Sequence, residues 1–179
     1  MAQISVNSHL FAQEIAPEQV QEQSLEDLMA QLRDPTLENW EPIERKIWQK
    51  WSASGSDTLD FLLQRGRDAL DVGSINDAIG HFSAAIDHDP NFAEAWNQRA
   101  TAFFFSGQYG PSMNDIQQVL VLNPDHFGAL TGMAMILERT DRPAEALDVV
   151  YRVLEVHPHR PDVLLAKDRL EKATAGSAL

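Results

Sequence analysis

A regular spacing of prolines constrains the fold of this chain more than any other sequence feature. Pro90, Pro124 and Pro158 are each separated by 34 residues. A period between about 20 and 50 residues is typical of repeat proteins, in which a small unit stacks on copies of itself. With each proline at position 32 of its unit, the predicted repeats span 59–92, 93–126 and 127–160.

Other positions of the repeat agree with this frame. Small residues recur at position 8, which are Gly66, Ala100 and Ala134. Large apolar residues recur at position 24, which are Phe82, Ile116 and Val150. Small residues allow two helices to approach closely, and large ones fill the layer between helices. The pattern therefore predicts pairs of packed helices.

Position 15 predicts the turn inside each pair. Gly73 and Gly107 occupy this position in the first two repeats. Glycine adopts the left-handed conformation that commonly ends a helix at little cost. The third repeat has Asp141 there, and aspartate tolerates this conformation better than most residues do. We therefore expect a helix–turn–helix unit in all three repeats.

The run Ala-Trp-Asn-Gln-Arg-Ala at 95–100, followed by Gly-Gln-Tyr at 107–109 and Asn-Pro at 123–124, resembles the tetratricopeptide repeat family. The resemblance implies an all-α fold, an α-solenoid of stacked antiparallel helix pairs. It also implies that the first helices of successive repeats line a concave, partner-binding face. The block from Ile47 to Gly66 is similar to small bacterial members of the family, some of which carry export signals.

Residues 24–58 are predicted to form a degenerate helix pair of the same kind. Ser24 and Asp27 have the spacing of a capping box, which begins a helix. The pair could cap the N-terminal end of the stack. We expect its tryptophans to pack in the core, with a partner site as the alternative; they are Trp40, Trp48 and Trp51.

The two ends of the chain are expected to differ. Residues 161–173 are predicted to form a C-terminal capping helix, because polar residues replace apolar ones on the side where no repeat follows. Residues 1–23 are polar, contain no Lys or Arg, and are predicted to be a flexible leader. Leu10, Phe11 and Ile15 give this leader a possible docking segment.

Composition excludes several functions. The net charge of −13 argues against general affinity for nucleic acid or anionic membranes. No apolar run reaches the roughly 18 residues of a membrane span, so no membrane insertion is expected. There is no cysteine, and no phosphate-binding loop or nucleophile motif. His157 and His159 are only two candidate ligands, and two ligands do not make a metal site. We expect the histidines to lie at the surface instead. We therefore expect no enzyme, cofactor or metal.

The family resemblance assigns a groove. Its concave-face positions mix amide and hydroxyl groups with apolar surface, which suits recognition of a peptide. The predicted partner-binding residues are Leu63, Arg67, Asn97, Gln98, Thr101, Phe104, Phe105, Thr131 and Met135. The same positions include Glu94, Gly128 and Gly132, and the two glycines leave room for a bulky anchor. Whether Phe104 and Phe105 are exposed or packed stays open.

A well-known site of the family is predicted to be absent. The family's clamp for the C-terminal carboxylate of chaperone tails uses Lys, Asn and Arg at five of these positions. This chain has Leu63, Arg67, Gln98, Gly128 and Gly132 there, and only the glutamine is close. Binding of chaperone tails is therefore not expected.

The leading hypothesis is a non-catalytic protein–protein interaction module that binds a peptide or helix of a partner in the concave groove. The alternative is a homo-oligomeric assembly protein that uses the stack ends or a groove-docked N-terminal segment. The compartment stays open, since the chain as written fits the cytoplasm, and the periplasm fits if an export signal has been removed. The sequence names no partner.

Overall fold

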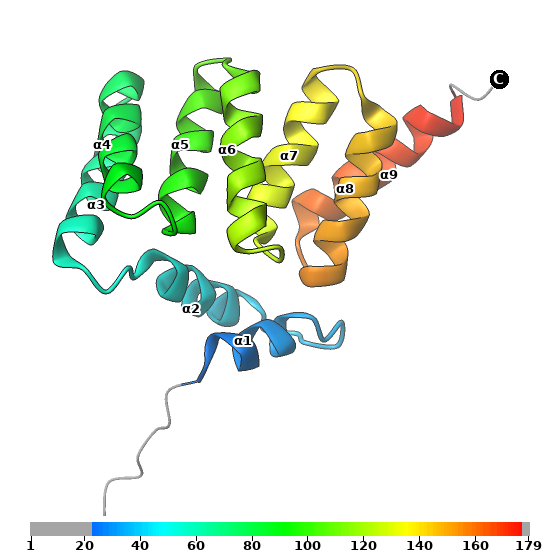
Figure 1. Ribbon diagram of the computed structural model, residues 1–179. Coiled ribbons are helices and arrows are strands. Elements are labelled where there is room, and N and C mark those ends of the chain that lie inside the picture. The colour runs from blue at the N-terminus through cyan, green and yellow to red at the C-terminus, as the bar shows by residue number, and fades with distance from the viewer. Residues whose placement is uncertain (1–22, 177–179) are drawn as a thin grey trace, which may run out of the picture.

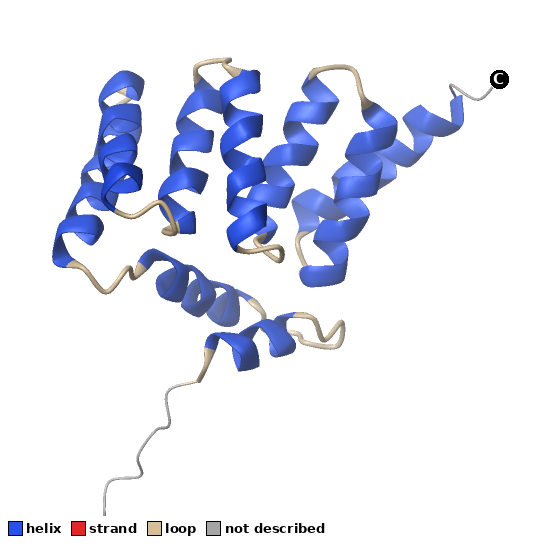
Figure 2. Ribbon diagram, in the orientation of Figure 1, coloured by secondary structure: helices blue, strands red, loops and turns tan. Residues whose placement is uncertain are grey.

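The computed structural model describes residues 23–176, and these residues form nine helices and no strand (Figure 2). The expected all-α fold is confirmed. Residues 1–22 and 177–179 lie outside the described residues, and so does the docking segment proposed around Leu10, Phe11 and Ile15.

Seven of the helices stand side by side in chain order (Figure 1). Three antiparallel pairs are followed by a single helix. They are α3 (Asp57–Asp71) with α4 (Ile75–His88), α5 (Ala93–Phe105) with α6 (Tyr109–Leu122), α7 (Phe127–Arg139) with α8 (Pro143–Val156), and α9 (Pro161–Gly176). We call α3–α9 the stack.

The observed bounds differ slightly from the repeat frame. Helix α3 begins at Asp57, two residues before 59, because the chain turns at Gly55, whose φ is 78°. Helix α9 continues to Gly176, beyond the expected end at 173, because Leu170 still packs in the core and Thr174 donates a hydrogen bond to its carbonyl.

The turns and close crossings have the geometry that the repeats predict. Gly73, Gly107 and Asp141 have φ of 76°, 75° and 58°. Asp141 is thus a non-glycine residue held in the left-handed region. At the crossing of α3 and α4, a Cβ on Gly66 would lie 2.2 Å from the ring of Phe82, so only glycine fits there.

Helices α1 (Leu25–Leu32) and α2 (Glu41–Ser52) form the N-terminal pair. The capping box at the start of α1 is confirmed, since Ser24 accepts from the Asp27 N–H at 3.1 Å and the Asp27 carboxylate accepts from the Ser24 N–H. Leu28 and Leu32, one turn apart on α1, and Ile47 of α2 are fully buried and give the pair one apolar face.

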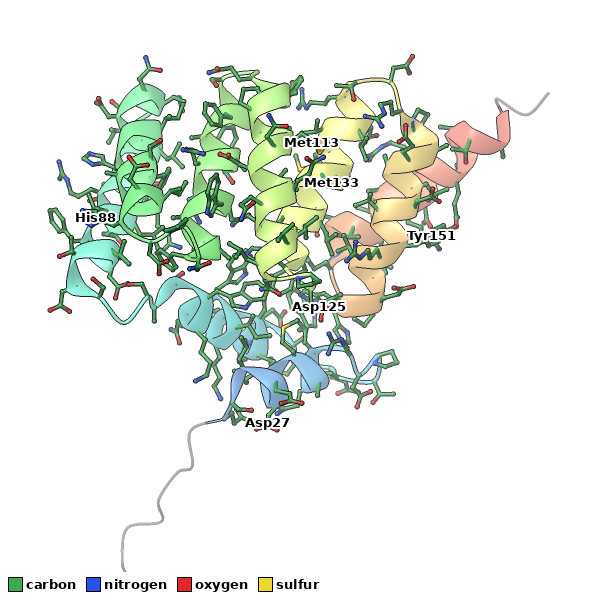
Figure 3. All side chains as sticks on the ribbon, in the orientation of Figure 1. Asp27, His88, Met113, Asp125, Met133 and Tyr151 are labelled. Carbon is green, nitrogen blue, oxygen red and sulfur yellow. The ribbon has the colours of Figure 1, made fainter. Side chains whose placement is uncertain are left out.

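The position of this pair corrects one expectation, because it does not cap the N-terminal end of the stack. It lies across the lower ends of the stacked helices in Figure 1. Its buried residues share a core cluster with Phe127 of α7 and Val156 of α8. Arg33 forms an ion pair of 2.6 Å with Asp125, which Figure 3 labels beside this boundary.

All three tryptophans of the N-terminal pair contribute to this contact. Trp40, Trp48 and Trp51 are half-buried and pack against the same core cluster. The preferred expectation that they pack in the core is therefore confirmed. Their rings, which are large and apolar with one polar edge, supply much of the surface that attaches the pair to the stack.

Candidate peptide-binding groove

The first helices α5 and α7, with α9, form a groove made of two adjoining hollows. The α5–α7 hollow has a volume of about 320 Å³, and the α7–α9 hollow has about 410 Å³. Thr131 and Met135 of α7 line both, so we call the two together the open groove. The α7–α9 hollow is mainly apolar, with a lining that includes Ala134, Val150, Val153, Val163, Ala166 and Leu170.

The α5–α7 hollow collects seven of the nine predicted binding residues. They are Asn97, Gln98, Thr101, Phe104, Phe105, Thr131 and Met135. Leu63 and Arg67 are not among them. Leu63 is 1% exposed and packs in the core between α3 and α4, while Arg67 is held by an internal carboxylate. These two side chains therefore cannot contact a ligand bound in the groove.

Two apolar side chains of the open groove face solvent. Phe105 is 67% exposed and Met135 is 43% exposed. Phe104 is half-buried, with its ring centroid 5.6 Å from that of Tyr109 and 6.0 Å from that of Phe105. Phe104 is thus partly packed and Phe105 is exposed, which answers the question that the sequence left open.

Glu94 is the buried carboxylate that holds Arg67. The sequence places Glu94 on the concave face, but the structure leaves it only 1% exposed. Its Oε1 accepts from Arg67 Nη2 at 2.8 Å and from Gln98 Nε2 at 2.7 Å. Its Oε2 lies 3.3 Å from Asn97 Nδ2 and 3.3 Å from His126 Nε2. Every partner is a donor, as a buried carboxylate requires.

His126 completes this network from the start of α7. Its Nδ1 accepts the Ala129 N–H at 3.1 Å, so the hydrogen bonds place the ring proton on Nε2, facing Glu94. Its ring stacks on Trp51 with centroids 4.3 Å apart.

The expectation that the histidines lie at the surface is wrong for His126 and His157, which are both fully buried. Their burial depends on Trp51, Trp48 and Trp40 of the N-terminal pair, which the repeat pattern did not place there.

The environment of Glu94 lowers its pKa. Burial by itself would raise the pKa of this carboxyl, because it removes the charged form from water. The hydrogen bonds of His126 and Gln98 and the charge of Arg67 together outweigh burial and bring the pKa of Glu94 below its ordinary value of 4.5. Glu94 is therefore ionised at neutral pH.

The same network fixes the polarity of the groove floor. Because a carboxylate only accepts, Asn97 and Gln98 must turn their NH2 groups toward Glu94. Thr101 and Thr131 donate their hydroxyl protons to the carbonyls of Asn97 and Phe127, at 3.0 and 2.8 Å. The side-chain oxygens that remain are acceptors, which suit the N–H groups of a bound peptide backbone.

The space at Gly128 is filled by the chain itself. A Cβ on Gly128 would lie 2.5 Å from Cη2 of Trp48. The bulky anchor that the sequence allows at this glycine is therefore the tryptophan of α2. One turn further along α7, a Cβ on Gly132 would lie 3.3 Å from the Cδ1 of Ile116, on the floor of the α5–α7 hollow. Trp48 thus closes one end of the open groove.

Two further searches bear on function. Between residues 23 and 176, no group of three or more His, Asp or Glu side chains is placed to bind a metal ion. None of the helices in this part of the chain is both long enough and apolar enough to cross a membrane.

The fold defines a class, the helical-repeat proteins, in which pairs of helices stack into a solenoid. The family model described as tetratricopeptide repeat matches residues 63–110. A TPR repeat-containing protein of Rhizobium etli is 38% identical over 139 residues, which cover 76% of this chain and 67% of that protein. The chain belongs to the tetratricopeptide repeat family.

Two more distant similarities extend this comparison. DnaJ homolog subfamily C member 3 of Rattus norvegicus is 32% identical over 111 residues, 62% of this chain but only 22% of that protein. The solved structure of the first TPR of Spaghetti (RPAP3), bound to an HSP90 peptide, has a TM-score of 0.64 and 22% identity. It covers 67% of this chain and 95% of its own, and it shows the shared fold.

Proposed function

We propose that this protein is a non-catalytic interaction module whose open groove binds a peptide or helical segment of a partner protein. The observation that carries the proposal is the continuity of the two hollows over α5, α7 and α9. Apolar anchors such as Phe105 and Met135 stand beside polar acceptors, and this combination suits peptide recognition.

The similar structure that holds an HSP90 peptide supports binding of a peptide in general. The chemistry of the chaperone-tail clamp does not carry over to this chain. Leu63 is in the core, Arg67 is bound to Glu94, and Gly128 is covered by Trp48. The proposed ligand is therefore not a chaperone tail held by its terminal carboxylate.

Substitution of the exposed groove residues tests the proposal. Phe105→Glu and Met135→Glu place a charge in the groove without removing a buried contact. Val121→Glu is the matched control, because Val121 is an exposed apolar residue of α6 that lines neither hollow. Partners captured from the source cells and identified by mass spectrometry are expected to be lost with both groove variants and retained with the control. An identical set from all four proteins would contradict the proposal.

A second candidate function is assembly of copies end to end. Phe61 of α3 is 63% exposed and Leu165 of α9 is 66% exposed, so apolar surface lies on both terminal helices of the stack. Because the N-terminal pair does not cap α3, this helix has its main packing partners on one side only, α4 and α5. Light scattering should show an oligomer that Phe61→Asp or Leu165→Asp dissociates. A monomer at all concentrations rules this candidate out.

A further inference from the structure

We propose that the segment bound by the open groove is an extended peptide in which an acidic side chain lies between two apolar side chains. In this arrangement the carboxylate meets Arg139 at the rim of the groove. The inference rests on the proposed function and adds the chemistry of the partner to it.

Arg139 is the last residue of α7 and is exposed at the boundary of the two hollows. It lines the α7–α9 hollow, and its guanidinium lies 5.5 Å from the ring centroid of Phe104, which lines the α5–α7 hollow. The ring holds the guanidinium in place by a cation–π contact. The Arg139 guanidinium thus lies beside both hollows.

Arg139 differs from the neighbouring arginines in having no carboxylate. Arg169 is bound by Glu138 at 2.8 Å, and Arg160 is bound by Asp162 at 2.7 Å. Among residues 23–176, no carboxylate forms an ion pair with Arg139. Its N–H donors therefore remain available for a ligand, and a carboxylate matches the planar fork of a guanidinium better than any other common side chain.

The overall charge of −13 does not oppose this arrangement at short range. Charges further away than about 8 Å are largely screened at physiological ionic strength. Two carboxylates, Glu138 and Asp162, line the α7–α9 hollow at short range, but each is already bound by an arginine. Arg139 is therefore the cation of this hollow that a carboxylate of the partner can bind. The net charge instead disfavours long acidic segments, so one acidic residue is expected rather than a run.

The shape of the groove favours an extended backbone. In an extended chain, side chains at i and i+2 point to one face and lie about 7 Å apart, while i+1 points to the other. Apolar side chains at i and i+2 can enter the two hollows on either side of Thr131 and Met135. The side chain at i+1 then points out of the groove, toward Arg139.

The groove floor supports the same register. Thr131 donates its hydroxyl proton to the Phe127 carbonyl, and Gln98 turns its amide NH2 toward Glu94, so the side-chain oxygens of both residues are left as acceptors. An extended peptide brings backbone N–H groups that these acceptors can bind. A helical partner would have most of its N–H groups already paired, and so would gain less from this floor.

Selection from a random heptapeptide library displayed on phage tests the inference, with the full chain as the target. The wild type is expected to select an apolar–acidic–apolar pattern. Arg139→Ala should keep the apolar positions and lose the acidic preference, and Arg139→Glu should select Lys or Arg in the middle. Arg45→Glu is the control, because Arg45 is exposed on α2 and lines neither hollow.

Affinities give the size of the effect. The probe is a fluorescein-labelled Ser-Leu-Glu-Leu-Ser peptide with an amidated end, which excludes binding through a terminal carboxylate. Replacing its Glu by Gln should weaken binding to the wild type about tenfold, as expected for loss of a hydrogen bond to a charged group. The same replacement should have no effect with Arg139→Ala.

The outcomes separate this inference from the proposed function. Selected peptides that still bind Met135→Glu would contradict the groove itself. Two outcomes would overturn this inference and leave the proposed function standing. In the first, the selected peptides need Met135 but show no preference for an acidic residue. In the second, they show that preference, but Arg139→Glu does not reverse it. If peptides bind only after removal of residues 1–22, the groove belongs to the chain's own N-terminal segment and the inference is also overturned.

Discussion

Helices α5 and α7 meet different surroundings at their two ends. At their N-terminal ends, Glu94 and His126 are buried, Trp51 stacks on the His126 ring, and Trp48 fills the space over Gly128. At their C-terminal ends, Phe105 and Arg139 are exposed beside the open groove. We call these the covered end and the open end.

The comparison shows that a position on the concave face does not by itself define a binding residue. The side chains of Glu94 and His126 at the covered end are hydrogen-bonded within the chain, so changing them should alter stability. Groups at the open end have few internal partners, so changing them should alter binding. The following changes test this division, from the largest expected effect to the smallest.

Trp48→Ala should have the largest effect on stability. It removes a half-buried ring that contacts Phe127 and His126 and fills the space over Gly128. We expect a loss of about 3 kcal/mol in the free energy of unfolding, the range found when large aromatic side chains are truncated. Urea unfolding measures it, with exposed Gln49→Ala as the control, and equal midpoints for the two variants would contradict a structural role for the covered end.

Glu94→Gln should destabilise the protein by about 2 kcal/mol at pH 7, because it removes the charge that Arg67 and His126 surround. The effect depends on pH. Since the folded pKa of Glu94 lies below 4.5, its contribution is complete above that pH and is lost as the pH falls through the folded pKa.

Unfolding measured from pH 7 to pH 3 checks this prediction. The wild type should lose stability more steeply than Glu94→Gln on acidification, and the two curves should approach each other at low pH. Parallel curves would show that Glu94 does not contribute in this way. Glu145→Gln is a suitable control, because this carboxylate pairs only with the exposed Arg142.

Gly128→Ala and Gly132→Ala compare the two ends within one turn of α7. Alanine at 128 would contact Trp48 at 2.5 Å, so the tryptophan must move, and we expect a loss of about 1.5 kcal/mol. Alanine at 132 faces only the flexible end of Ile116 at 3.3 Å, and the gain in helix propensity should offset the crowding to within about 0.5 kcal/mol. Thermal unfolding of both variants measures the two losses in stability. Equal losses would contradict the distinction between the covered end and the open end.

Asp141→Gly should have the smallest effect, at the turn that follows the open end. Asp141 has a φ of 58°, and glycine accepts this conformation without strain, so a gain of about 0.5 to 1 kcal/mol is expected. Gly107→Asp, at the equivalent turn with a φ of 75°, should lose a similar amount. The melting temperatures of the two variants should therefore move in opposite directions, and a shared direction would argue against backbone strain as the cause.

The repeat frame predicted the local structure well because its signals act between neighbours. Gly66 against Phe82 and the left-handed turn at Asp141 are decided by residues within one repeat. Because such contacts recur in every repeat, the residues that make them recur every 34 positions and can be read from the sequence. The family resemblance, rather than the period, grouped the groove residues, and seven of the nine line one hollow because they lie on the neighbouring helices α5 and α7.

The frame could not predict where the N-terminal pair docks. That contact joins residues far apart in the chain, and the pair has no proline at position 32 to align it. The burial of His126 and His157 depends on the same contact. One sequence signal pointed to an internal role for His126. This residue lies just before α7, where a side-chain acceptor can cap the helix.

The docking of the N-terminal pair also bears on how the protein folds. In a linear array each repeat contacts only its neighbours, so the ends can unravel one repeat at a time. Here the His159 ring is hydrogen-bonded to the Leu32 carbonyl at 3.1 Å across 127 residues, and Arg33 binds Asp125. Opening the last repeat must therefore also release the beginning of the chain. Such distant contacts slow folding but link the repeats into one cooperative unit. Inserting a further repeat between these contacts would break that link, whereas an addition beyond α9 would leave it intact.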